Sequence, residues 1–374
     1  AFASAGWFVS GALTVVLTFV SVTNLQLDTS DKFSAALWQF VLDVPLGQYL
    51  SLSVLIAAIV TIGALAVSSL RNTLFLAALA ILGIVPLALT GHAAGSAGHA
   101  MAVNSIGMHL LAITVWVGGL VAVLFLKGKD QDFNVTLVSR YSTLALIAFG
   151  VTAVSGAASA LVRIPSWGLL FSNYGYLVMA KVVALGVLGI FGYLYRVRII
   201  ARMKSSGTSV FVRLVIAELF VMGVASGLGT ALSKTAPPEV GGGFEQFTPA
   251  QILTGEKLPG ELFASGWFTV WKIDILWASI CLGLAVAYLY GVWRMHKRGD
   301  KWAWGRTASW LAGVALLFYI TNGVMNAYEQ YLFSVHMIAH MMLTMAVPVL
   351  LVPGAPVTLI ARAAEKRHDS SRGL

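Results

Sequence analysis

Histidine and methionine residues gather at the start of one apolar stretch of this chain. The chain has seven histidines. The loop GHAAGSAGHAM and the apolar segment that follows it contain His92, His99, Met101, Met108 and His109. Met101 and Met108 are seven residues apart, so a helix would place them on one face. Imidazole together with thioether suits copper, especially Cu(I), and suits Mg or Ca poorly. These five residues therefore predict a copper site.

A second group of the same residue types lies in the segment HMIAHM. It consists of His336, Met337, His340 and Met341. Imidazoles four residues apart share a helix face and can bind one metal ion, as the HExxH zinc motif does. No Glu lies between them to act as a general base, and the methionines favour Cu(I) over zinc. The segment therefore predicts a second copper site without hydrolytic activity, and its binding should weaken at acid pH because neutral imidazole is required.

These residues also have other interpretations. Met commonly fills apolar helices, and His92 and His99 could be ordinary residues of a Gly/Ala-rich turn. A histidine inside a membrane could hydrogen-bond to a neighbouring helix, although ionisable groups there are usually functional. Histidines on facing membrane helices also bind haem. A haem protein that transfers electrons through the same histidines is therefore the main alternative to a copper protein.

The composition predicts an all-α polytopic membrane protein. Hydrophobic residues make up 58% of the chain and charged residues only 10%, with a mean hydropathy of +0.85, far from the values of soluble proteins. Apolar stretches long enough to cross a bilayer recur along the chain. We expect about ten transmembrane helices, at residues 6–25, 47–67, 73–91, 102–126, 141–162, 174–195, 210–232, 267–291, 307–326 and 332–352.

The basic residues predict the orientation of these helices. The net charge is +9, and eighteen of the 24 Lys and Arg residues fall in alternate loops on one side of the predicted spans. Cytoplasmic loops carry such an excess, so this side and both ends of the chain are predicted to be cytoplasmic. The charge is thus explained by the membrane, and we expect no nucleic-acid partner. Both histidine groups then lie at the extracytoplasmic face.

Several classes of protein are excluded. Cys281 is the only cysteine, so the chain has no internal disulfide and no metal site built from several thiolates. A copper-pumping ATPase would need a membrane cysteine pair and a DKTG phosphorylation motif, and neither is present. No catalytic arrangement was found, so we expect a binding or transport protein rather than an enzyme.

Two charged residues lie inside predicted spans. Lys181 in LVMAKVVAL and Glu218 in VIAELFVM belong to consecutive antiparallel spans, so we expect an intramembrane charge pair, with a role in proton or ion movement as the alternative. Asp274 in KIDILW is a weak additional candidate for a metal ligand. Residues 26–46 contain SAALWQFVLDVP, which predicts a short interfacial helix anchored by Trp38.

Two longer segments resemble known families. Residues from about 70 to 237 resemble the copper resistance protein D (CopD) membrane domain, through the GH loop, MHLLAITVWVGGL, NYGYLVMAKVVALGVLGIFGYLYRVRI and ELFVMGVASGLGTALSKTAPP. Residues from about 267 resemble the start of the CtaG-type cytochrome oxidase assembly family, through YLYGVWRMHKRGDKWAWGRTASWLAGV and FSVHMIAHMMLTMAVPVLLVPGAPVTL. The order is similar to an actinobacterial CopD–CtaG fusion.

The resemblance implies a division of the chain and a function. The expected parts are N-terminal transmembrane helices (1–69), a CopD-like domain (70–237), an extracytoplasmic Pro/Gly-rich linker (238–266) and the N-terminal part of a CtaG-like domain (267–374). The implied function is copper movement at the cell membrane and copper supply to cytochrome c oxidase. Implied partners are copper, an extracytoplasmic copper chaperone, oxidase subunits and the lipid bilayer. CtaG domains normally continue through further spans, so we expect a fragment of a longer protein.

Overall fold

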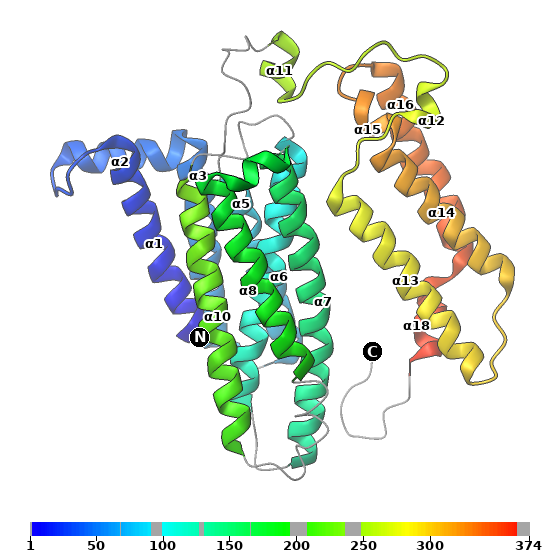
Figure 1. The fold of residues 1–374 in the computed structure, drawn as a ribbon, viewed down its shortest axis with the longest axis horizontal. Helices are drawn as coiled ribbons and strands as arrows, with labels where there is room; N and C mark the ends of the chain where they lie inside the picture. The colour runs from blue at the N-terminus through cyan, green and yellow to red at the C-terminus, as the bar shows by residue number, and fades with distance from the viewer. Residues whose placement is uncertain are drawn as a thin grey trace. The chain divides into compact units, whose positions relative to one another are not determined.

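The structure, a computed structural model, describes residues 2–67, 69–90, 99–126, 131–164, 166–194, 208–235 and 248–364. Every regular element within these ranges is a helix, and ten helical segments are long and apolar enough to cross a membrane (Figure 1). The prediction of an all-α multi-pass protein is confirmed. The chain forms two compact units, Ala1–Glu245 and Gln246–Leu374, which are described separately below.

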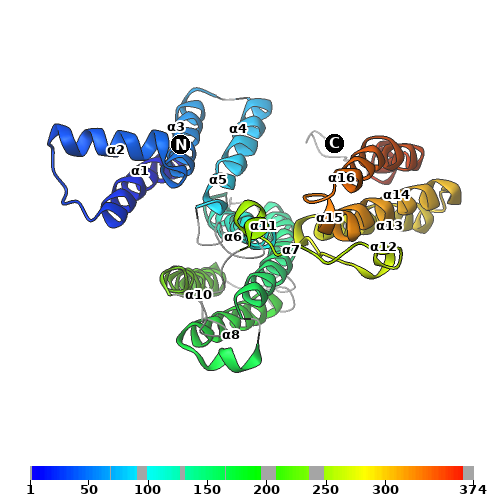
Figure 2. The same ribbon diagram turned by 90° about the horizontal axis from the view of Figure 1, so that it is seen from above.

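The first unit contains the helices that precede the linker. Their bounds are α1 (Phe2–Thr23), α2 (Asp31–Asp43), α3 (Pro45–Ala66), α4 (Leu70–Leu82), α5 (Val85–Ala88), α6 (His99–Leu126), α7 (Gln131–Arg163), the 3₁₀ helix Trp167–Phe171, α8 (Asn173–Leu194) and α10 (Thr208–Lys234). Helix α6 packs along α7, and α10 packs along α8. Viewed from above, these four helices lie together (Figure 2). Their shared interior includes Trp116, Leu120, Val123, Val138, Leu188, Val215 and Met222.

Helix α2 lies across the ends of α1 and α3 (Figure 1). Its inner face packs through Phe40 and Phe33 on Phe19 of α1, with Phe19–Phe33 ring centroids 5.2 Å apart in an edge-to-face arrangement. Gly47 permits the close turn into α3, because a Cβ there would lie 2.1 Å from the Phe40 carbonyl oxygen. The predicted helix is therefore present. Trp38 is 64% exposed, as an interfacial anchor would be, and its place at a membrane surface stays a prediction.

The second unit contains three membrane-length segments and several short helices. Its elements are α11 (Pro249–Thr254), α12 (Gly266–Thr269), α13 (Ile275–Lys297), α14 (Trp304–Asn322), α15 (Val324–Tyr328), α16 (Phe333–Met341), a π-helical turn (Met342–Ala346), α17 (Val347–Leu351), a 3₁₀ turn (Val352–Gly354) and α18 (Pro356–Ala363). The segment Trp304–Tyr328 is half buried, which makes α14 the central helix of this unit.

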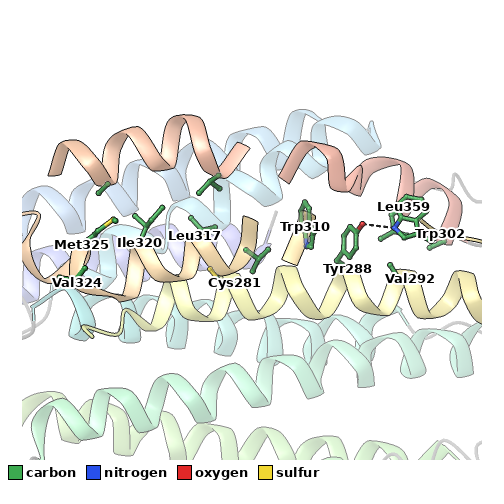
Figure 3. Close-up of a cluster of buried hydrophobic side chains, with 14 of the residues drawn as sticks. Cys281, Tyr288, Val292, Trp302, Trp310, Leu317, Ile320, Val324, Met325 and Leu359 are labelled. Atoms are coloured by element: carbon green, nitrogen blue, oxygen red, sulfur yellow. Dashed lines mark hydrogen bonds between the residues drawn. The ribbon is translucent and has the colours of Figure 1, made fainter. Parts of the chain in front are cut away.

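The core of the second unit joins α13, α14 and the last span (Figure 3). Tyr288 stacks on Trp310 with 5.0 Å between the ring centroids. The Tyr288 hydroxyl donates to the Gly354 carbonyl at 2.8 Å and accepts from the indole N–H of Trp302 at 3.1 Å. Gly313 lets α17 approach α14, because a Cβ there would meet Leu351 at 2.7 Å. These contacts fix the last span against the central helix.

Three predicted spans have clearly different ends in the structure. The span predicted at 141–162 begins earlier, because α7 runs from Gln131 to Arg163. The span predicted at 267–291 begins at Ile275, because Asp274 caps α13 and the preceding residues are extended. The last span, predicted to end at 352, continues to Ala363. It passes the Pro/Gly turn through Ala355, which adopts a left-handed conformation with φ of 46°, and restarts at Pro356. Proline suits the first turn of the new helix.

Part of the predicted linker is folded onto the second unit. Helix α11 begins with a capping box between Thr248 and Gln251. The Thr254 hydroxyl lies 3.0 Å from the Tyr331 hydroxyl, and the Tyr328 hydroxyl donates to the Gly260 carbonyl at 3.0 Å. Residues 248–266 therefore cover the end of the unit from which α16 starts.

Candidate metal centres

His109 lies on α6 and faces α7. Its Nδ1 atom is 3.1 Å from the hydroxyl oxygen of Ser155, a fully buried residue. The Ser155 hydroxyl donates its hydrogen to the Val151 or Thr152 carbonyl, at 2.6 and 3.2 Å. The hydroxyl oxygen therefore accepts from His109, which places the hydrogen of neutral imidazole on Nδ1. The lone pair on Nε2 is then available to a metal ion, as in many histidine metal sites.

The other predicted ligands of this first site are only partly described. Met101 is partly buried and Met108 is buried on the same helix as His109, so α6 carries all three as predicted. The backbone of His99 begins α6, and its side chain lies outside the described residues. His92 also lies outside them.

The structure does not bring Lys181 and Glu218 together. The ammonium group of Lys181 reaches α10 at Gly229, 3.5 Å from the position that a Cβ would take. Glu218 lies on the same helix eleven residues earlier, which is about 16 Å along the axis. Both residues lie in the first half of their own helices. Because α8 and α10 are antiparallel, these halves are at opposite ends of the bundle, and the expected charge pair does not form.

The second group forms one exposed surface on α16. His336, Met337, His340 and Met341 are all exposed, with Met337 at 40% and Met341 at 49%. Val335 and Ala339, each 2% exposed, form the opposite face and pack in the core. The predicted grouping on one helix is therefore present, and its side chains point away from the described part of this unit.

A π-helical turn follows this surface directly. It spans Met342–Ala346, and the Thr344 hydroxyl donates to the His340 carbonyl at 2.8 Å. π-turns within α-helices are rare and occur frequently at functional sites. The wide turn sets the second group apart from the regular helix that continues at α17.

Glu329 is a residue near this surface that the sequence analysis missed. It lies in the turn before α16, near His336 and Lys272. Burial raises the pKa of the Glu329 carboxyl, and His336 and Lys272 partly oppose that rise. Lys272 itself pairs with Glu256. The only signal in the sequence was an acidic residue seven positions before His336, at the edge of an apolar stretch.

We expect Glu329→Gln to stabilise the second unit at neutral pH and to have no effect at about pH 4. A carboxyl whose pKa is raised on folding holds its proton more tightly in the folded state, so stability falls as pH rises through the interval above 4.5. Glutamine removes this cost, and for a half-buried group the gain should be below about 1 kcal/mol. Thermal unfolding in detergent at both pH values measures the difference. A less stable variant at neutral pH would show that the carboxylate is stabilising there.

Asp274, the weak additional candidate, caps helix α13. Its Oδ1 atom accepts from the backbone N–H groups of Leu276 and Trp277, at 2.9 and 3.2 Å. A capping carboxylate satisfies otherwise unpaired N–H groups at a helix start, which accounts for this residue without a metal.

The described side chains contain no group of three or more His, Cys, Asp or Glu residues placed to hold a metal ion.

Three families match this chain in sequence. Residues 1–103 match the copper resistance protein D-like N-terminal domain, residues 135–232 match copper resistance protein D, and residues 286–374 match the cytochrome c oxidase caa3 assembly factor CtaG. The chain is a CopD–CtaG fusion. The three matches account for both structural units, and they link this multi-pass cell-membrane protein to copper resistance and to cytochrome c oxidase assembly.

Relatives of the fusion include two mycobacterial proteins and one Bacillus protein. An uncharacterized protein of Mycobacterium leprae is 30% identical over 295 residues, which are 78% of this chain and 42% of the relative. An uncharacterized protein of Mycobacterium bovis is 28% identical over 285 residues, 75% of this chain and 40% of the relative. The copper transport protein CutJ of Bacillus subtilis is 33% identical over 100 residues, 25% of this chain and 18% of CutJ. No solved structure matches.

The fusion thus spans about two fifths of the length of its mycobacterial relatives. The family names describe copper resistance and an assembly factor rather than an enzyme. A copper-related function of this membrane protein follows.

Proposed function

We propose that this CopD–CtaG fusion binds Cu(I) at the extracytoplasmic side of the cell membrane and passes it across the bilayer or to cytochrome c oxidase. The observation that carries the proposal is the orientation of His109. Its Nδ1 atom is held by Ser155, so Nε2 is left as a metal ligand inside a membrane bundle. Met101 and Met108 on the same helix offer soft sulfur, and His92 and His99 complete the proposed first site.

The exposed surface of α16 is the proposed second site. His336 and His340 are four apart with Met337 and Met341 beside them. The Glu329 carboxyl near His336 favours a cation at this end of the helix. An exposed ligand set suits exchange of copper with another protein, so we assign to this site the contact with an extracytoplasmic copper chaperone or with oxidase subunits.

Haem is less well supported than copper by the same geometry. A six-coordinate haem needs ligands on opposite faces of the iron, and His336 and His340 lie on one face of a single helix. His296, at the C-terminal end of α13, is separated from them by the length of the span. A visible spectrum of the purified protein distinguishes the two ligands, because haem gives a strong Soret band and bound Cu(I) does not.

We expect His109→Ala to lower the copper content of the purified protein. Ser155→Ala should also weaken Cu(I) binding, but by a smaller factor than His109→Ala. Loss of His109 removes a ligand. Loss of Ser155 removes the group that orients the ring, and changes of this kind typically cost 10–100-fold in metal affinity. Titration with Cu(I) against a competing chelator, together with metal analysis, measures both effects.

His296→Ala is the matched control, because it removes a histidine outside both groups. It should leave the copper content unchanged. If a variant that lacks His109, His92 and His99 binds as much copper as the parent protein, the proposed first site is wrong.

A further inference from the structure

Two buried polar groups inside the first unit lack hydrogen-bond partners among the described residues. They are the indole nitrogen of Trp116 and the hydroxyl of Thr152, in side chains that are 5% and 6% exposed. Nearly all buried polar groups in native proteins are paired with protein or with ordered water. The two groups therefore indicate a place inside the bundle where a small polar species binds.

Glu218 faces the same interior. It is 6% exposed, and Val215 and Met222 on either side of it pack in the core with Trp116. The indole of Trp116 lies near enough to act on the Glu218 carboxyl, but no hydrogen bond of regular geometry joins the two groups. A bridging water would satisfy both groups, since a buried water typically makes about three hydrogen bonds.

Among the described side chains, none of the charged groups on the surrounding helices pairs with this carboxyl. On α8, Lys181 lies at the level of Gly229, about 16 Å away along α10, and Tyr193 is 66% exposed. On α6, the nearest titratable group is His109, seven residues before Trp116, or about 10 Å along the axis. On α7, Arg140 is exposed and the Tyr141 hydroxyl donates to the Trp116 carbonyl at 2.9 Å. Between Val215 and Ser233, α10 carries no other charged residue, and the side chain of Arg213 lies outside the described part of the chain. A buried carboxylate without a charged partner is costly, which favours a proton-binding role for Glu218.

The unpaired groups lie between Glu218 and His109. On α7, Ser155 contacts His109, and Thr152 precedes Ser155 by one helical turn. A further turn along, Phe149 packs edge-on against Trp116 with 5.6 Å between the ring centroids. Because α6 and α7 are antiparallel neighbours, the order along the bundle is His109, Thr152, Trp116 and then Glu218. Figure 2 shows the helices that carry these residues, α6, α7 and α10, lying together with α8.

We propose that Glu218 is a proton-binding site that exchanges its proton through bound water held by Trp116 and Thr152. In the loaded state the carboxyl carries the proton and donates to the water. In the unloaded state the proton passes to that water and onward toward the His109 end of the bundle, and the carboxylate accepts from the indole N–H. This site is separate from the copper ligands proposed above and does not depend on them.

Infrared difference spectroscopy of the full chain in liposomes tests the proposal. We expect acidification to produce a C=O stretching band of a buried protonated carboxylic acid, which shifts in D₂O and is lost in Glu218→Gln while the bands of exposed carboxyls remain. Trp116→Phe and Thr152→Val should keep the band but shift its frequency, because they remove a donor to the water or to the carboxylate. Glu261→Gln, at an exposed position outside the bundle, is the matched control and should leave the band in place.

Two results would overturn the proposal. One is a band that persists in Glu218→Gln, which would assign it to another carboxyl. The other is a parent protein whose spectrum is the same in H₂O and D₂O, which would mean that no proton exchanges. Circular dichroism of each variant confirms that the helices are retained, and if Glu218→Gln fails to fold, the absence of any shift in Trp116→Phe overturns the proposal equally.

Discussion

Replacing both His336 and His340 by alanine is expected to abolish copper binding at the exposed surface of α16. Outer-shell changes alone cost 10–100-fold in metal affinity, so loss of both imidazoles should cost at least about 100-fold. Both side chains are exposed, and the core contacts of α16 come from Val335 and Ala339. The double variant should therefore fold and insert normally.

The test combines metal analysis with oxidase activity in cells. We expect the double variant to retain the copper bound at His109 and to lose the remainder, with impaired maturation of cytochrome c oxidase. Met337→Leu with Met341→Leu is a useful companion, because it keeps the apolar volume and removes only the sulfur. Unchanged copper content and normal oxidase activity in the double alanine variant would leave these histidines without a metal role.

The helices could be predicted from the sequence because each apolar stretch is long enough to span a bilayer. The grouping of candidate metal ligands on single helices could also be predicted. Met101, Met108 and His109 share α6, and His336 and His340 share α16. Residue spacing within one helix fixes such relations.

Relations between helices could not be predicted in the same way. Ser155 orients His109 from 46 positions away, and nothing in the local sequence marks that pair. The predicted contact between Lys181 and Glu218 was wrong. The depth of each residue in the membrane was inferred from the middle of its apolar stretch, whereas the structure places Lys181 beside Gly229. Glu329 was missed because a turn, rather than a continuous helix, brings it near His336.

Asn322 is a fully buried polar side chain in the second unit. Its Oδ1 atom accepts from the backbone N–H of Asp274 at 2.8 Å. Its amide nitrogen donates to the Phe318 carbonyl at 3.2 Å and to the Thr321 hydroxyl at 2.9 Å. The Asn322 carbonyl also accepts from the N–H of Lys272 at 2.9 Å. Asn322 thereby joins the end of α14 to the extended residues before α13.

We expect Asn322→Ala to lower the free energy of unfolding of the second unit by about 2–3 kcal/mol. The substitution leaves the Asp274 N–H without its partner, which costs about 1–3 kcal/mol for a buried donor, and it also removes side-chain packing. Unfolding in mixed micelles, followed by circular dichroism, measures the loss.

Asn326→Ala is the matched control, because Asn326 makes one comparable bond, to the Lys272 carbonyl at 2.9 Å, from a less buried position. It should cost about 1 kcal/mol.

Asn322 and Asn326 both hold the backbone of Lys272, whose side chain interacts with Glu256 and Glu329. Asn322→Ala should therefore also disturb the charges beside His336 and weaken copper binding there, which Asn326→Ala should do to a smaller extent. Equal losses of stability in the two variants would mean that the Asn322 contacts do not hold the start of α13 in place.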